Sequence, residues 1–217
     1  MTAAELIAAV QRAIGALAPA YQNAATEAYL YEAALFAAAV QAAERAGGVC
    51  LLTTDGRNAV SELTFRRGPG NLWSGNYAYA LVSFAGSSKR LEIHLAVFVV
   101  GASGVPHEAD IALVDAQEAE RSRRARIHPR RSGLIAGIEA KHYAVSPGIG
   151  IGRSFLGLSA ELGQIKCSLA FPAKSDPSLA TLIARKPSEA FDEVIPESAA
   201  EDRLQSHLDQ AIRNWLA

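Results

Sequence analysis

The chain has 217 residues and a formal net charge of −1, and half of its residues are hydrophobic. This length fits one domain that buries a proper core, and the composition excludes a disordered chain. The balanced net charge points to no partner by itself. Its distribution is uneven, however, because the stretch 121–131 holds six arginines and the segment after Lys186 is rich in acidic residues.

The compartment is suggested by features that the sequence lacks. The N-terminal residues carry no basic region of the signal-peptide kind, and no window has the long uncharged apolar run that a membrane span needs. Cys50 and Cys167 have no partner spacing, so the sequence predicts neither a disulfide framework nor a zinc site. We therefore expect a cytoplasmic protein without a membrane partner.

Hydrophobic periodicity and turn residues predict alternating helices and strands along the chain. Helices are expected at about 2–17, 23–48, 153–164, 177–186 and 199–217. Strands are expected at 49–54, 58–67, 77–86, 89–101, 107–116, 133–145 and 166–174, with a loop rich in Gly and Asn at 68–76. This order of elements predicts an α/β fold with a mixed sheet.

Three acidic residues lie in apolar surroundings: Glu32 in YLYEAALFAAAV, Asp110 in HEADIALV and Glu139 in GIEAK. Residues i and i+2 of a strand point to the same face, so Glu139 and Lys141 are predicted to project side by side. Buried charges are costly unless they are paired, bound to a metal or used in chemistry. Mg²⁺ prefers oxygen ligands, and a nearby lysine can orient a metal-bound water or neutralise charge on a phosphate.

The arrangement resembles the PD-(D/E)XK phosphodiesterases, the restriction-endonuclease-like superfamily. The motif of this family places an acidic residue on one strand and Glu/Asp-X-Lys on the adjoining strand. Asp110 and Glu139-Ala140-Lys141 occupy these positions here, and Glu32 matches the glutamate that many members carry on a preceding helix. The resemblance implies a single nuclease-like domain over 1–217, with an αβββαβ core at about 27–172 and a C-terminal helical extension at about 175–217.

The resemblance also implies a function, a metal-dependent endonuclease that hydrolyses phosphodiester bonds of nucleic acid, with DNA favoured. It makes Asp110 and Glu139 ligands of Mg²⁺ or Mn²⁺, with Glu32 supporting the metal and Lys141 positioning water or stabilising charge. The motif proline is not adjacent to Asp110, and Glu108 shares a face with Asp110 and competes for its role. Restriction or anti-phage defence is the commonest setting of stand-alone relatives.

Partners follow from the same resemblance. Cutting both strands of a duplex with one site per chain would favour a homodimer, with the C-terminal amphipathic helix as a candidate dimer element. A partner protein that targets or activates the nuclease is compatible with the sequence as well.

The arginine-rich stretch and one further arginine are candidates for phosphate contacts that do not depend on nucleotide sequence. They are Arg121, Arg123, Arg124, Arg126, Arg130, Arg131 and Arg153. The alternative is a solvated helix face, because Glu118 and Glu120 precede arginines by three residues, a spacing at which side chains on a helix form ion pairs. Trp73, Tyr77 and Tyr79 either stack on bases or fill a core.

Two other functions stay open at this point. One is a non-catalytic nucleic-acid-binding or complex-assembly module on the same fold. The other is a nucleotide-binding protein that uses SPGIGIG (146–152), although this stretch lacks the spacing of GxGxxG and the Lys-Ser/Thr of a P-loop, and a flexible turn is the plainer interpretation.

Overall fold

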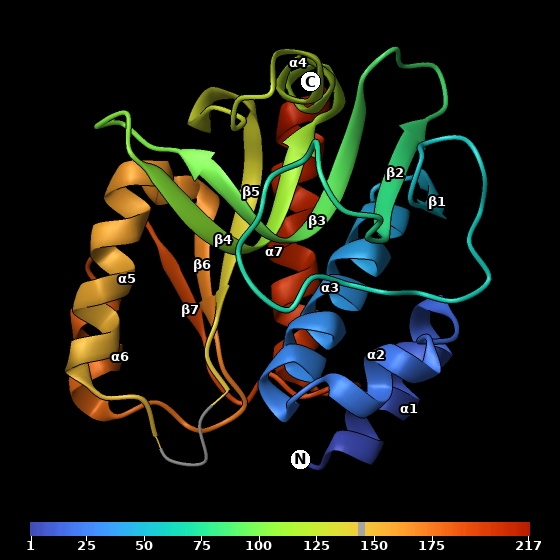
Figure 1. Ribbon diagram of the computed structural model, residues 1–217. Helices are drawn as coiled ribbons and strands as arrows, with labels where there is room; N and C mark the ends of the chain where they lie inside the picture. Colours follow the sequence, from blue (N-terminus) through green and yellow to red (C-terminus); the bar gives the residue numbers. More distant parts are fainter. Residues whose placement is uncertain (143–145) are drawn as a thin grey trace.

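The fold is seen in a computed structural model that describes residues 1–142 and 146–217 (Figure 1). Its strands form one sheet in the order β1-β2-β3-β4-β5-β6-β7. The strands are β1 Gly48–Thr53, β2 Tyr79–Phe84, β3 Arg90–Val100, β4 Pro106–Asp115, β5 Leu134–Ala140, β6 Cys167–Ala170 and β7 Glu189–Phe191. Neighbours from β1 to β5 are antiparallel, and β6 and β7 continue in parallel. The prediction of an α/β fold with a mixed sheet is confirmed.

Helices pack on this sheet, and α1, α3, α4, α6 and α7 begin at residues whose side chains cap them. They are α1 Ala3–Ile14, α2 Pro19–Ala24, α3 Glu27–Arg45, α4 Ala116–Ala125, α5 Ile149–Leu162, α6 Pro177–Ile183 and α7 Ala199–Leu216, with short 3-10 turns η1 Arg131–Gly133 and η2 Gln164–Lys166. Asp115 caps α4 by accepting hydrogen bonds from the first turn, and Thr2 forms a capping box with Glu5. Within the described ranges, no helix is both long and apolar enough to span a membrane.

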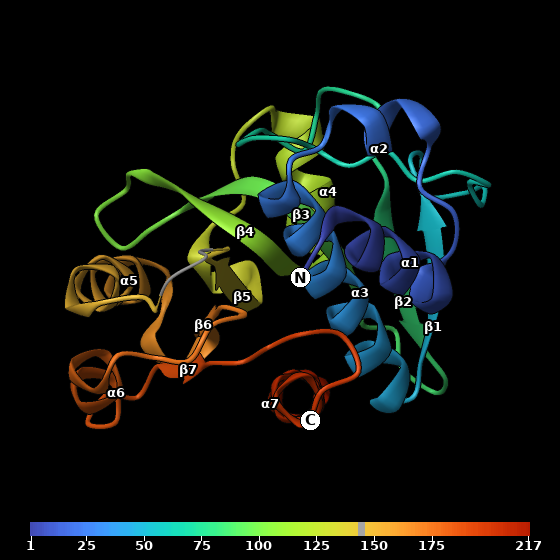
Figure 2. The ribbon, with the colours of Figure 1, turned by 90° about the horizontal axis from the view of Figure 1, so that it is seen from below.

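Two hydrophobic clusters lie on the two sides of the sheet. The larger joins α1, α3 and α7 to the sheet, and the smaller joins α4, α5 and α6 to β3, β4 and β6 (Figures 1 and 2). The apolar stripe of α7 is fully buried at Leu204, Leu208 and Ile212, and α7 packs on α3 and β5. The C-terminal helix therefore uses its apolar face within the chain, which argues against it as the dimer element.

The predicted strand at 58–67 is not formed. Residues 54–78 connect β1 to β2 and touch other elements through isolated bridges, Leu17 with Leu63 and Gly70 with Val97. Leu63 and Phe65 are buried, so the alternation that suggested a strand is real. The two buried side chains anchor the long connection to the core, and the segment forms no strand of the sheet.

The structure departs from expectation at further places along the chain. The short elements α2 and β7 had no signal long enough to be predicted. The helix α5 begins at Ile149, so Gly150 and Gly152 are helical and the flexible-turn interpretation is wrong. A Cβ at Gly152 would lie 2.5 Å from the Leu179 side chain, so this glycine lets α6 approach α5 closely. Gly152 therefore serves helix packing and not a turn. The end of the strand predicted at 133–145 lies outside the described residues.

Candidate carboxylate–lysine site

Asp110 lies at the point where β4 and β5 separate. The ladder between these strands runs from Ile111 opposite Ile138 to Val114 opposite Leu134. Beyond it, the Ala140 backbone N–H donates a 2.7 Å hydrogen bond to Asp110 Oδ2. The side chain of Asp110 thus takes the place of a ladder carbonyl. This bond fixes the carboxylate, which is only 8% exposed, in the fork between the two strands.

Lys141 follows β5 directly and keeps an extended path, because its backbone N–H donates to the carbonyl of Ala170 in β6. Its ammonium Nζ lies 2.6 Å from Glu139 Oε1 and 3.8 Å from Asp110 Oδ2. The prediction that Glu139 and Lys141 project side by side is confirmed. The three side chains are 12% to 26% exposed to water, and this shielding strengthens their mutual electrostatic interaction.

Two further acidic side chains, Glu32 from α3 and Glu108 from β4, interact electrostatically with these residues. Burial, together with the charges of Asp110 and Glu108, raises the pKa of Glu32 to about 8. Burial and the neighbouring Glu139 raise the pKa of Asp110 to about 7, against the opposing effects of Lys141 and the Ala140 N–H. Burial and Glu139 also raise the pKa of Glu108. These five residues are called the carboxylate–lysine site below.

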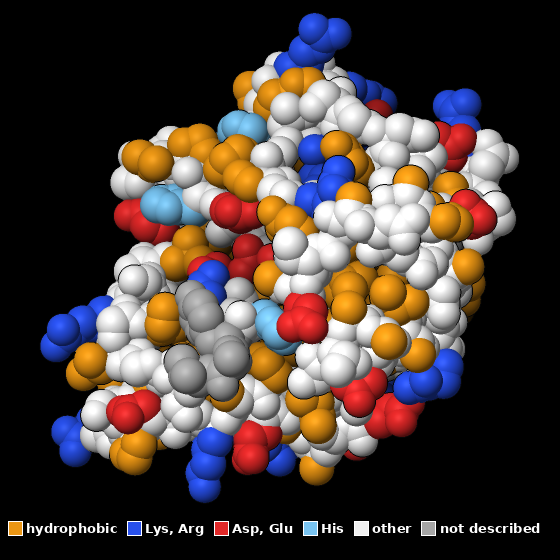
Figure 3. Space-filling view, turned by 60° about the horizontal axis from the view of Figure 1, so that its bottom comes forward, with side chains coloured by type: hydrophobic (Ala, Val, Ile, Leu, Met, Phe, Trp, Pro, Cys, Tyr) orange, Lys and Arg blue, Asp and Glu red, His pale blue; other side chains and the backbone are white. Residues whose placement is uncertain are grey.

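The carboxylate–lysine site has more acid than base. Four carboxyl groups surround one lysine, and the raised pKa values follow first from burial and then from repulsion between neighbouring carboxylates. The face shown in Figure 3 carries several acidic side chains, some of them close to basic ones. A cation bound between the carboxylates of the carboxylate–lysine site would relieve their repulsion.

Oxygen ligands of this kind suit Mg²⁺ or Mn²⁺, which one or two carboxylates and several waters can hold. The described residues contain no group of three Asp, Glu, His or Cys side chains already close enough to hold a metal ion. Asp110 and Glu139 are instead drawn to the Lys141 ammonium. The donor chemistry therefore fits a hard divalent cation bound by two carboxylates and water, and it does not fit a closed structural metal site.

The arginines of 121–131 lie on α4 and in the segment that follows it. Four of them are ion-paired: Arg121 with Glu118, Arg123 with Glu92, Arg124 with Glu120, and Arg130 with Glu118. The solvated-face alternative thus accounts for part of the stretch. Arg126, Arg131 and Arg153 are exposed, and no acidic partner is seen for their side chains within the described part of the chain.

The arginine-rich stretch is not adjacent to the carboxylate–lysine site. The helix α4 starts after Asp115, five residues beyond Asp110 on the same strand, so its first turn is roughly 17 Å away along β4. The arginines of α4 therefore lie apart from Asp110 and are not part of the carboxylate–lysine site.

The aromatic candidates have different surroundings. Tyr79 is buried and stacks on His94 with ring centroids 4.7 Å apart, so it fills a core position. Tyr77 lies under the guanidinium of Arg66, 4.4 Å from ring centroid to Cζ, and stays partly exposed. Trp73 packs against His128 at 5.1 Å. Base stacking is open to the exposed rings alone.

One polar cluster was missed by the sequence reasoning. Glu92 is 4% exposed in β3, accepts a 2.7 Å hydrogen bond from His94 Nε2, and is held by both terminal nitrogens of Arg123. The signal was present, because Glu92 and His94 stand two apart in an apolar strand, as Glu139 and Lys141 do.

No protein family, curated protein sequence or solved structure matches this chain. Its function is therefore inferred from the residues and the geometry of the carboxylate–lysine site.

Proposed function

We propose that the protein is a metal-dependent phosphodiesterase that cleaves nucleic acid as an endonuclease, with DNA as the favoured substrate. The observation that carries this proposal is the fork between β4 and β5, which gathers Asp110, Glu139 and Lys141 from two adjoining strands. The chain order is α3, β1, β2, β3, β4, α4, β5, α5, β6, which contains the elements of an αβββαβ core if β1, β2 and α4 are additions to it; this is the fold-level support for membership in the PD-(D/E)XK superfamily.

Under this proposal Asp110 and Glu139 hold Mg²⁺ or Mn²⁺, and Glu32 supports the same cation or a second one. When bound, such a cation supplies Lewis acidity and a coordinated water of lowered pKa. The excess of carboxylates over lysine favours this use, since the site gains a positive charge where the chain itself supplies too little. Glu108 is the reserve ligand, on the same strand as Asp110.

Lys141 contributes a fixed positive charge. Its ammonium is held by Glu139 at 2.6 Å, and it reaches toward Asp110. A phosphodiester bound in the fork would develop negative charge on its non-bridging oxygens as water attacks phosphorus. An ammonium already in place stabilises that charge without reorganisation, and its N–H groups can orient the attacking water.

A second function is favoured by a separate observation. Lys141 already neutralises two of the carboxylates, and the described residues show no preformed three-ligand group. A chain that used the fork only as a structural ion-pair cluster would be a nucleic-acid-binding or complex-assembly module. A defence role and an activating partner would be compatible with either function.

The deciding experiment is a cleavage assay on supercoiled plasmid, linear duplex, single-stranded DNA and RNA, each with Mg²⁺, Mn²⁺ or EDTA. We expect cleavage with a divalent cation, its loss in EDTA, and a fall of at least 100-fold in Lys141→Ala. Lys174→Ala, which removes an exposed lysine elsewhere, is the matched control. Cleavage that survives in Lys141→Ala would reject the assigned role, and binding without cleavage of any substrate would favour the binding module.

A further inference from the structure

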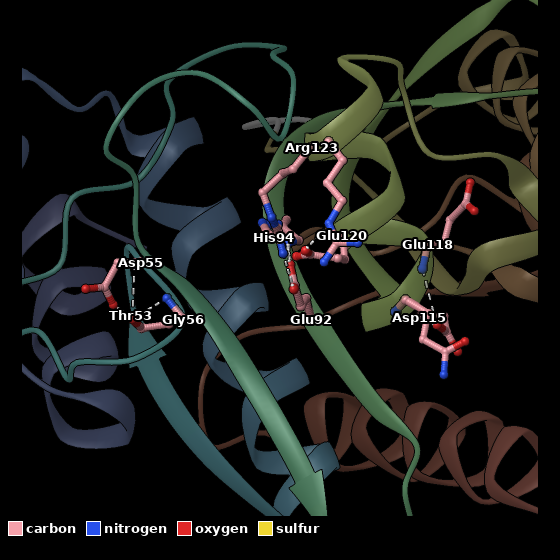
Figure 4. A network of polar contacts seen from close by, with 11 residues as sticks. Thr53, Asp55, Gly56, Glu92, His94, Asp115, Glu118, Glu120 and Arg123 are labelled. Atoms are coloured by element: carbon pink, nitrogen blue, oxygen red, sulfur yellow. Dashed lines mark hydrogen bonds and ion pairs between the residues drawn. The ribbon is translucent and has the colours of Figure 1, made fainter.

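A second polar region lies over β2 and β3, away from the carboxylate–lysine site. It is a cavity of about 430 Å³, walled by the turn after β1, by β2 and β3, and by α4. Figure 4 shows two of these walls, the turn at Asp55 and Gly56 and the helix with Glu120 and Arg123. Four arginines line the cavity: Arg57, Arg90, Arg123 and Arg124. It is called the arginine-lined cavity below.

The acidic residues of the arginine-lined cavity are already occupied. Asp55 accepts hydrogen bonds from the backbone N–H groups of Arg57 and Asn58, and these bonds hold the pKa of its carboxyl well below the usual range. Glu92 is buried, and hydrogen bonds from His94 and Arg123 outweigh that burial and lower its pKa to about 2. Both carboxylates therefore stay ionised, and their oxygens accept hydrogen bonds from groups within the chain.

The arginines are not balanced in the same way. Arg123 is tied to Glu92, and Arg124 Nε lies 2.7 Å from Glu120 while its side chain stays 79% exposed. The guanidinium groups of Arg57 and Arg90 have no acidic or hydrogen-bond partner within residues 1–142 and 146–217. Both are exposed at the mouth of the cavity, on different walls, so two unpaired cations border one concave space.

This chemistry selects an anion. A guanidinium presents a planar fork of N–H donors that matches the oxygens of phosphate, and it is always charged. Two such forks around a polar cavity suit a phosphate group better than a carboxylate, because a phosphate offers three or more acceptor oxygens to both walls. Glu92 and Arg123, which are bonded to each other, line the cavity beneath it.

We propose that the arginine-lined cavity is a phosphate-binding site, in which Arg57 and Arg90 hold a phosphate group next to Arg123 and Arg124. The site deepens the proposed function, because a phosphate of the bound nucleic acid is the ligand that the nuclease would supply. Glu92 lies four residues before Ala96, whose neighbours in β3 pair with the strand segment around Asp110. That separation is roughly 13 Å along β3, so the cavity would hold a phosphate other than the one cleaved.

The test is binding by the double variant Arg57→Gln/Arg90→Gln, measured in EDTA so that cleavage plays no part. Fluorescence anisotropy with a labelled DNA duplex gives affinity over a series of salt concentrations. Losing two phosphate contacts should reduce the steepness of log K against log salt by about 1.8. The control Arg185→Gln/Lys186→Gln removes the same charge from an exposed segment elsewhere and should leave the slope within error.

A second arm separates the sources of the phosphate. Calorimetric titration with inorganic pyrophosphate reports binding of a free phosphate ligand. Loss of duplex affinity in the variant identifies the nucleic-acid backbone as the source. An unchanged duplex affinity with lost pyrophosphate binding identifies a free phosphate compound. Either result supports the site.

The proposal fails if the double variant matches wild type in duplex affinity, salt slope and pyrophosphate binding. Arg57→Lys/Arg90→Lys keeps the charges but not the forks, and should recover part of the affinity with an unchanged slope. Thermal unfolding of each variant checks that the fold is kept, as expected for two exposed side chains without partners. Because binding is read in EDTA, a phosphate site without nuclease activity and a nuclease without this site are distinguishable.

Discussion

Glu32→Gln is expected to stabilise the metal-free protein at alkaline pH. The pKa of Glu32 is raised from its usual 4.5 to about 8, first by burial and then by Asp110 and Glu108. The folded state therefore holds its proton more tightly than the unfolded state does. The contribution of Glu32 to the free energy of unfolding is therefore greatest at low pH, and it decreases as pH rises from about 4.5 toward about 8.

The magnitude follows from the size of the shift. Each pKa unit corresponds to 1.36 kcal/mol, so a shift from 4.5 to about 8 sets a ceiling near 5 kcal/mol. Water still reaches part of the Glu32 side chain, and we expect about half of that ceiling to be realised. The glutamine variant should thus gain about 2 to 3 kcal/mol at pH 8, and less than about 1 kcal/mol at pH 5.

Urea unfolding of wild type and Glu32→Gln in EDTA at both pH values measures this difference. Glu44→Gln, an exposed position on the same helix, is the control and should change stability by less than about 0.5 kcal/mol at either pH. A glutamine variant that is less stable than wild type at pH 8, or whose effect does not depend on pH, would refute the reasoning about the crowded carboxylates.

Two further predictions concern the fold. Arg123→Ala leaves the buried Glu92 carboxylate with fewer partners and should lower the free energy of unfolding in urea by about 3 kcal/mol. In wild type, the stabilisation that Glu92 provides should be lost as pH falls toward its pKa of about 2. Gly152→Ala places a methyl group 2.5 Å from the Leu179 side chain and should lower the free energy of unfolding by about 1 to 3 kcal/mol. Gly157→Ala, in the same helix but with open space around it, should raise the free energy of unfolding by up to about 1 kcal/mol. Thermal unfolding distinguishes the two.

The pair Glu139 and Lys141 could be predicted from the sequence because the rule behind it is local. A strand alternates faces, so two charged residues two apart must share one. Asp110 lay in a second strand, and its approach to Lys141 depends on register and on the fork between β4 and β5, which periodicity does not encode. The family resemblance supplied that link as an expectation.

Other features depended on tertiary context. The alternating Leu63 and Phe65 predicted a strand, yet the backbone of the segment makes isolated bridges in place of a continuous ladder, and the segment becomes part of a long connection. The glycines at 148–152 suggested a turn, because the use of Gly152 in helix packing depends on Leu179, far along the chain. The ion pair between Arg123 and Glu92 spans 31 residues, so the arginine-rich stretch looked freer than it is.

The central claim is that the carboxylate–lysine site becomes fully ionised by taking up a divalent cation. Calorimetric titration with Mn²⁺ near pH 7, in two buffers that differ in ionisation enthalpy, counts the protons released on binding. We predict binding with net proton release, because Asp110 and Glu32 have raised pKa values, and loss of that binding in Asp110→Asn. Absence of Mn²⁺ binding in wild type, or equal binding in Asp110→Asn, would contradict the account.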